Sequence, residues 1–142
     1  MDFRQAFNTV AAELTPQPWE YTSGEGATLT VIPEGLTAEP GDAEVIVRVT
    51  VDKTQAAEAG VTTTDLPALI DAIEQHTAWM HTTLTGDRIE ITQPAVGELR
   101  LSVTELHGRR ETEAHLMVPA RQWWPLGSAL RRALDVARGW ER

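Results

Sequence analysis

The chain has no cysteine among its 142 residues. Disulfide bonds, thiolate catalysis and cysteine-ligated zinc are therefore excluded, and a secreted scaffold held by disulfides is disfavoured. Long apolar runs are also missing, since no stretch approaches the roughly 18 residues that a membrane-spanning helix needs. The start, Met1-Asp2-Phe3, lacks the basic and apolar regions of a signal peptide. We therefore expect a cytoplasmic protein with no membrane partner.

Basic side chains are scarce. The 12 lysines and arginines are outnumbered by 21 acids, for a net charge of −9. Because nucleic-acid binding depends mainly on neutralising phosphates, this composition disfavours nucleic acid as a partner. The exception is residues 121–142, which carry five arginines against two acids. These arginines suit the negative end of a closing helix.

Hydrophobic periodicity predicts three helices and two groups of three strands. Apolar residues at helical spacing place the helices at about 3–14, 66–84 and 122–139. Alternation of apolar and polar residues places strands around residues 19–21, 29–31, 45–51, 89–91, 99–103 and 114–118. Residues 52–63 are predicted to be a loop, and Gly86 to follow the end of the second helix.

The predicted fold is therefore α+β, with the order α-βββ-α-βββ-α. Short links between successive strands imply antiparallel meander sheets, which pack against the three helices. The length favours one domain spanning residues 1–142. The two βββα halves are alike in pattern, but their residue identity is too thin to predict a repeat.

No set of residues predicts catalysis, a cofactor or a metal site. The histidines His76 and His81 are five positions apart, so they would not share a helix face. No third ligand completes a zinc-type motif. Ser128 lacks a nucleophile-elbow sequence around it, and paired acids such as Glu111 and Glu113 are typical of a solvated surface. We therefore expect a protein that is not an enzyme and has no cofactor.

Tryptophan is the residue used most unusually. The chain has five, against two phenylalanines and one tyrosine. Trp123 and Trp124 are adjacent, so on a helix they would point about 100° apart, and one core does not easily take both. A wide helix–sheet interface could still bury both. The alternative is a partner-binding surface, where tryptophan is enriched and methionine adapts to the partner. The candidate partner-binding residues are Trp79, Met80, Met117, Trp123 and Trp124.

The order of elements resembles the class I type III secretion chaperone and YbjN-like superfamily. The matching stretches are Phe3 to Leu14, Glu44 to Val51, Leu66 to Leu101 and Leu126 to Trp140, including LPALIDAIEQHTAWMHTTLTGDRIEIT and ALRRALDVARGWER. This resemblance implies a homodimer that holds a partner segment on exposed apolar patches. The chain departs from the family at Gln75 and His76, where an asparagine is usual, and in the additional strand from Thr112 to Val118.

Three functions follow as hypotheses. The leading one is a non-catalytic, chaperone-like or adaptor-like module that binds another protein, or a second copy of itself as a homodimer, by strand addition beside aromatic anchors. The second is an acidic inhibitor of the immunity or antitoxin type, which would use the acidic loop from Glu34 to Glu44. The third is single-stranded nucleic-acid binding of the Whirly sort, which also uses two βββα units; Arg109, Arg110 and the last helix would supply the positive charge.

Overall fold

The computed structural model describes residues 19–34 and 39–141, which form two four-stranded antiparallel sheets and two α-helices. The first sheet contains β1 (Trp19–Thr22), β2 (Thr28–Glu34), β3 (Glu44–Thr50) and β4 (Ala56–Thr62) in spatial order. The second sheet contains β5 (Trp79–Thr82), β6 (Arg88–Thr92), β7 (Glu98–His107) and β8 (Arg110–Pro119). The helices are α2 (Leu66–Gln75) and α3 (Trp123–Gly139), and the 3₁₀ turn η1 (Ala120–Gln122) leads into α3. The α+β class is confirmed, and the helix predicted at residues 3–14 lies outside the described residues.

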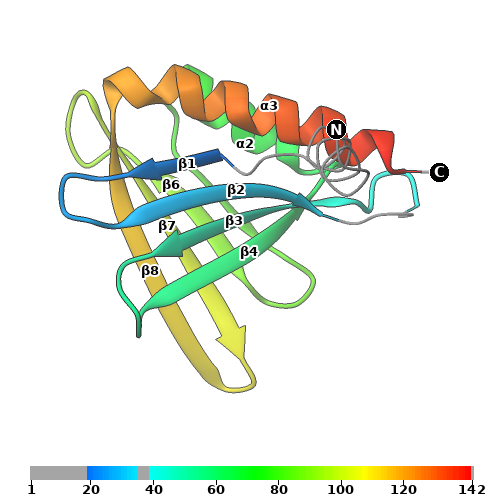
Figure 1. The fold of residues 1–142 in the computed structure, drawn as a ribbon, viewed down its shortest axis with the longest axis horizontal. Coiled ribbons are helices and arrows are strands. Elements are labelled where there is room, and N and C mark those ends of the chain that lie inside the picture. Colours follow the sequence, from blue (N-terminus) through cyan, green and yellow to red (C-terminus); the bar gives the residue numbers. More distant parts are fainter. Residues whose placement is uncertain (1–18, 35–38, 142) are drawn as a thin grey trace, which may run out of the picture.

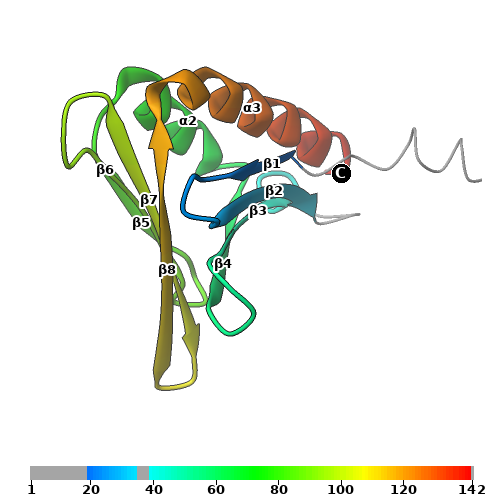
Figure 2. The same ribbon diagram turned by 60° about the vertical axis from the view of Figure 1, so that its left-hand side comes forward.

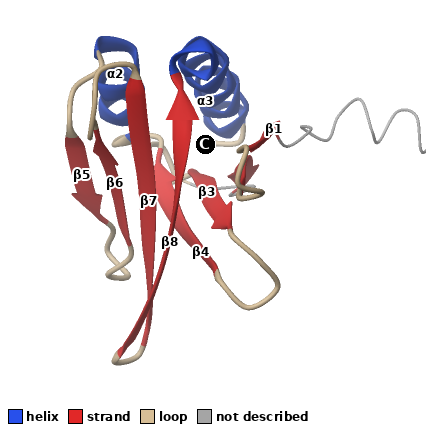
Figure 3. Ribbon diagram, turned by 90° about the vertical axis from the view of Figure 1, so that its left-hand side faces the viewer, coloured by secondary structure: helices blue, strands red, loops and turns tan. Residues whose placement is uncertain are grey.

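Both helices lie on one side of the molecule, and the turns of the β3–β4 and β7–β8 hairpins project on the opposite side (Figures 1 and 3). The β7–β8 hairpin has the longest strands and extends beyond the first sheet (Figure 2). Each sheet therefore has one face turned toward the other elements and one face turned outward.

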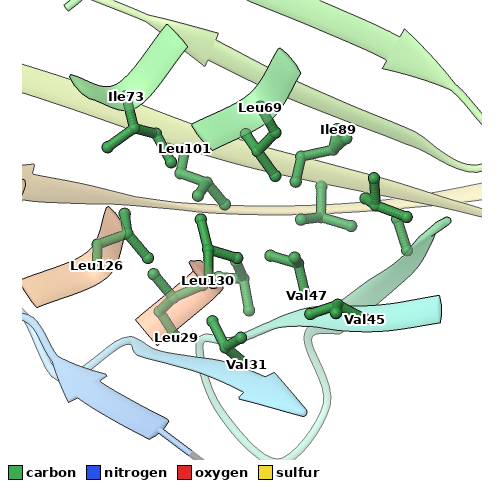
Figure 4. Close-up of a cluster of buried hydrophobic side chains, with 14 of the residues drawn as sticks. Leu29, Val31, Val45, Val47, Leu69, Ile73, Ile89, Leu101, Leu126 and Leu130 are labelled. Atoms are coloured by element: carbon green, nitrogen blue, oxygen red, sulfur yellow. The ribbon is translucent and has the colours of Figure 1, made fainter. Parts of the chain in front are cut away.

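One hydrophobic cluster joins the two sheets and the two helices. Figure 4 shows Leu29 and Val47 of the first sheet opposite Leu101 of the second, with Leu69 of α2 and Leu130 of α3 between the strands. All five side chains are almost fully buried. Burying a side chain of this size stabilises the fold by about 1.5–3 kcal/mol relative to leaving it exposed. The sheets and helices therefore hold one another in place.

Strand β4 corrects the prediction that residues 52–63 are a loop. Its sequence, AAEAGVT, has few of the β-branched and aromatic residues that favour strands, so the pattern did not reveal it. At Gly60 the Glu44 carboxylate lies over the backbone, and it would have to move to make room for a Cβ atom. The first half of the chain therefore has four strands, not three.

Helix α2 is shorter than predicted, and strand β5 takes the place of its second half. His76 adopts a left-handed conformation with φ of 56°, and the backbone N–H of Thr77 donates to the Ala72 carbonyl over 2.9 Å. This is a helix-ending arrangement usually made with glycine. Met80 and Leu84, which were predicted to continue the buried stripe of the helix, are instead exposed by 61% and 107%. The order of the described elements is therefore ββββ-α-ββββ-α, and the packing of three helices is not matched.

The two halves are equivalent in structure, although their sequences did not predict a repeat. The same residue types recur 60 positions apart in the first hairpin of each half, in the pairs Trp19 and Trp79, Thr22 and Thr82, and Gly26 and Gly86. The register is also the same, since Trp19 lies opposite Val31 as Trp79 lies opposite Ile91. The turns close alike, because the Ser23 N–H donates to the Ala27 carbonyl over 2.8 Å and the Thr83 N–H donates to the Asp87 carbonyl over 2.8 Å. The chain is an internally duplicated ββββα unit.

The segment after α3 is tied back to the first sheet by Glu141. Its Oε2 atom accepts hydrogen bonds from the backbone N–H of Gly41 over 2.8 Å and of Ala43 over 3.2 Å, and from the hydroxyl of Thr63. The Thr63 hydroxyl, followed by these backbone donors, lowers the pKa of Glu141 below its usual value. The carboxylate therefore fixes the end of α3 beside the loop that precedes β3 (Figure 1).

We expect Glu141→Gln to lower the midpoint of thermal unfolding by a few degrees at pH 7, because three donors no longer have a charged acceptor. Since the pKa of Glu141 is lowered by folding, this stabilisation is present above the unfolded value near 4.5 and is lost as the pH falls below it. The midpoints of both proteins should therefore converge as the pH is lowered below the folded pKa of Glu141, which lies under 4.5. Glu25→Gln, in the exposed β1–β2 turn, is the control and should leave the pH 7 midpoint unchanged. A difference that persists at low pH would contradict this assignment.

The duplicated turns provide a matched pair of glycines. Gly26 and Gly86 have φ of 92° and 91°, where alanine is strained by about 1–2 kcal/mol. A Cβ atom at Gly26 would meet nothing within 4 Å, whereas at Gly86 it would lie 2.6 Å from Leu106 Cδ2. Gly86→Ala should therefore reduce the free energy of unfolding more than Gly26→Ala in urea denaturation. In a Leu106→Ala background the two costs should become equal, and a persistent difference would show that Leu106 is not the cause.

Candidate functional site

The outward side of the second sheet carries a polar surface with two arginines. Side chains directly opposite each other on neighbouring strands share a face of the sheet, and Ile89, Ile91, Leu101 and Leu116 mark the buried face. The other face, here named the outer face of the second sheet, contains Met80, Thr82, Arg88, Glu90, Thr92, Arg100, Ser102, Thr104, Glu113, His115 and Met117. Arginine, glutamate, hydroxyl, histidine and methionine side chains therefore share this face.

A hollow of about 260 Å³ lies on this face. Its lining consists of two arginines, two glutamates and three hydroxyl side chains: Arg88, Arg100, Glu90, Glu113, Thr92, Ser102 and Thr104. The guanidinium groups can donate to an anion, and the hydroxyls can either donate or accept. The hollow therefore suits a ligand with both anionic and polar groups, and the glutamates oppose a purely anionic one.

Arg100 has an incompletely satisfied guanidinium group. Its Nη2 atom lies 3.3 Å from Nδ1 of His115. Its Nε atom is buried and has no hydrogen-bond partner within the described residues. Nδ1 of His115 is also 3.0 Å from the Glu113 carboxylate, and one ring nitrogen cannot accept from arginine and donate to glutamate at the same time. The buried Nε atom is out of reach of a ligand, so any hydrogen bond from Arg100 to a ligand comes from its Nη atoms.

Arg88 is also held loosely. Its Nη2 atom reaches Thr104 Oγ1 at 3.5 Å, at the limit of a hydrogen bond. In the part of the chain that the structure describes, Arg88 and Arg100 form no ion pair with a carboxylate within 4.0 Å. Arg131 in α3, in contrast, is bonded to both oxygens of Glu74 at 2.8 and 2.6 Å. Arg88 and Arg100 are therefore available charges in an acidic protein.

The predicted partner-binding residues are separated by the fold. Met80 and Met117 both lie on the outer face of the second sheet, on its two edge strands β5 and β8. Trp79 lies on the other face, packs against the core and stacks on His81 with ring centroids 5.7 Å apart. Their role in binding a partner stays a prediction.

Trp123 and Trp124 differ sharply in environment. Trp123 is half-buried against the core, donates its Nε1 hydrogen to the Val118 carbonyl over 2.8 Å, and contacts the ring of His76 at a centroid distance of 4.0 Å. Trp124 is 80% exposed. One indole therefore packs against the core, and the other, Trp124, is the more accessible to another molecule.

Sequence reasoning missed Arg88 and Arg100. The signal was present in the strands themselves, because Arg88, Glu90 and Thr92 alternate with the buried Ile89 and Ile91. The residues predicted to supply positive charge for nucleic-acid binding were instead Arg109 and Arg110, which lie at the turn of the β7–β8 hairpin. No group of three or more potential metal ligands occurs within residues 19–34 and 39–141.

The fold is shared with solved structures of low sequence identity. WHY3 from Arabidopsis thaliana is 13% identical with a TM-score of 0.61, and the match covers 88% of this chain and 90% of that chain. The plant transcriptional regulator PBF-2 is 16% identical with a TM-score of 0.59, covering 89% and 86%. The MRP1/MRP2 structure from Trypanosoma brucei is 14% identical with a TM-score of 0.65, covering 100% and 99%. No family model and no curated protein matches this chain.

These similarities correct the leading hypothesis. The resemblance to secretion chaperones and YbjN-like proteins is wrong, because the chain shares its fold with WHY3, PBF-2 and MRP1/MRP2. The predicted chaperone-like or adaptor-like function, which was based on that resemblance, is therefore also wrong. The expectation that nucleic acid is disfavoured as a partner is wrong as well. The prediction that the chain is not an enzyme agrees with its similarity to a transcriptional regulator. Within the described ranges, no helix is long and apolar enough to span a membrane.

The two adjacent tryptophans give a direct stability test. Trp123→Ala should lower the free energy of unfolding by about 2–3 kcal/mol, below the range for a fully buried tryptophan, because it removes one hydrogen bond and a half-buried ring. Trp124→Ala should change it by less than about 0.5 kcal/mol, as for other exposed sites. Urea denaturation followed by circular dichroism measures both. Equal reductions would mean that Trp124 also packs against the protein.

Proposed function

We propose that this protein binds single-stranded nucleic acid and does not catalyse a reaction. The observation that carries the proposal is the fold: nearly the whole chain matches structures of WHY3 and of the transcriptional regulator PBF-2 at TM-scores of 0.61 and 0.59. The Whirly hypothesis of the sequence analysis is thereby favoured over the other two. The duplicated ββββα unit is the structural form of the two βββα units on which that hypothesis was based.

The outer face of the second sheet has the chemical groups that such binding uses. Arg88 and Arg100 can contact phosphates, and guanidinium planes can also stack on unpaired bases. Met80, which is 61% exposed, and Met117 offer apolar contacts at the two edges. The surrounding hydroxyls of Thr92, Ser102 and Thr104 can bond to sugars or base edges.

The charge of the protein limits the strength of binding. With a net charge of −9, the chain as a whole repels a polyanion. Two available arginines correspond to few released counterions, so we expect modest affinity and a shallow dependence on salt. A single strand is favoured over a duplex because its bases are free to contact methionine and guanidinium side chains, whereas a duplex offers mainly phosphates.

The test is titration of the protein into labelled single-stranded DNA, single-stranded RNA and duplex DNA at low salt, followed by fluorescence anisotropy. Strands of about 20 nucleotides exceed the size of a typical single-strand site. We expect saturable binding to at least one single strand and weaker binding to the duplex. Protein denatured by heat, and an unrelated protein of equal net charge, are the controls. The absence of binding to every strand at low salt would refute the proposed function.

A further inference from the structure

The internal duplication allows the outer faces of the two sheets to be compared position by position. Strand pairs occupy the same register in both halves: Thr28 lies opposite Thr50 as Arg88 lies opposite Thr104. Further pairs agree in the same way, since Ile32 faces Ile46 where Thr92 faces Arg100, and Thr30 faces Arg48 where Glu90 faces Ser102. The first sheet is therefore an internal reference for the second.

The comparison shows that the buried faces agree and the outer faces differ. On the buried side, Leu29 and Val31 correspond to Ile89 and Ile91, and all four are almost fully buried. On the outer side, the two arginines of the hollow take the places of uncharged residues. Arg88 corresponds to Thr28, and Arg100 corresponds to Ile46. Met80 corresponds to Glu20.

The arginine on the outer face of the first sheet is neutralised within that sheet. Arg48 donates from Nε to Glu58 Oε2 over 2.8 Å, and its Nη2 lies 2.7 Å from the same oxygen. The second sheet has Ser102 at the position of Arg48. Its own arginines, Arg88 and Arg100, occupy other positions and form no ion pair with a carboxylate among the described residues. The chain thus contains one self-paired face and one face with available cations.

We infer that the two faces have diverged in function: the outer face of the second sheet contacts the phosphates of a single strand through Arg88 and Arg100, and the outer face of the first sheet takes no part. This inference rests on the proposed function and assigns it to one half of the chain. The two arginines are about four residues apart along the strands, or about 13 Å, and both line the same hollow. A strand lying across the hollow meets both guanidinium groups.

The arginines are tested by giving the second sheet the residues of the first. Arg88→Thr and Arg100→Ile, singly and together, should make log K fall less steeply with log salt, by about 0.7 for each phosphate that is no longer neutralised and about 1.4 for the pair. The matched control is Arg48→Ser, which removes one positive charge from the first sheet and installs the residue found in the second. Its salt dependence should equal that of the unchanged protein, measured by anisotropy between about 50 and 200 mM salt.

A second pair of variants tests the same assignment without removing an arginine. Glu90→Gln removes a negative charge from the hollow and should tighten binding several-fold at low salt. Glu20→Gln removes one from the outer face of the first sheet and should leave binding unchanged. Circular dichroism melting of every variant verifies that it is folded.

The outcomes separate the inference from the function on which it rests. If the unchanged protein binds single strands but Arg88→Thr and Arg100→Ile leave the salt dependence intact, the assignment to the second sheet is wrong and the function stands. The same conclusion follows if Arg48→Ser is as damaging as Arg88→Thr. If the unchanged protein binds no strand, the function and the assignment both fail. If only the second-sheet variants respond, the assignment is supported.

Discussion

The alternation of side chains across eight strands is the constraint on which the structure depends. Along most of the strands every second residue enters the shared core, and a one-residue shift would expose this apolar set to water. Val45, Val47 and Val49 on β3 and Leu99, Leu101 and Val103 on β7 follow this rule without exception. The outer residues between them do not have to be apolar, because they do not pack in the shared core. A face built in this way can change its charge and polarity while the fold remains the same.

Comparison of the two halves of this chain shows which positions vary while the fold stays the same. The features that the two halves share are those that geometry requires: inward tryptophans at the start of each hairpin, glycines with positive φ in the turns, and β-branched or leucine residues on the buried side. The features that differ lie where neither the core nor a turn constrains them. Gly60 is a local exception, since the Glu44 carboxylate lies over its backbone and would have to move to make room for a side chain there. Burial and chain geometry therefore explain which positions are shared.

Much of this fold was predictable from periodicity, and the failures have physical causes. Strands β1, β2, β3, β6, β7 and β8 and helix α3 were predicted because their apolar residues recur at regular spacing. Strand β4 was missed because alanine and glycine leave no alternating pattern, although its register with β3 is regular. Helix α2 was extended too far because Met80 and Leu84 continue its apolar spacing, whereas a left-handed histidine ends the helix at a position where glycine is the usual signal.

The candidate site was harder to predict than the fold, because it depends on which charges are paired. Sequence alone shows that Arg48, Arg88 and Arg100 occupy strands. It does not show that Arg48 is bonded to Glu58, ten residues away on the next strand, while the other two lack such a partner among the described residues. The difference between Trp123 and Trp124 also depends on tertiary contacts, since Trp123 is bonded to the Val118 carbonyl and packs on His76 whereas Trp124 is exposed. Both the pairing of the arginines and the burial of the tryptophans depend on contacts between residues of different secondary-structure elements.

Net charge disfavoured nucleic acid too strongly as a predicted partner, because it averages over the whole surface. The force on a bound strand comes mainly from charges within about one Debye length, roughly 8–10 Å at physiological salt. Acids farther than that from a ligand on the second sheet repel it less, because salt screens their repulsion more than it screens a direct arginine–phosphate contact. This distant repulsion weakens binding at low salt and flattens the overall salt dependence. It acts almost equally on variants that differ only at the site. Differences between such variants therefore report on the arginine–phosphate interactions that the proposed function requires, even though the overall charge of the protein opposes a polyanion.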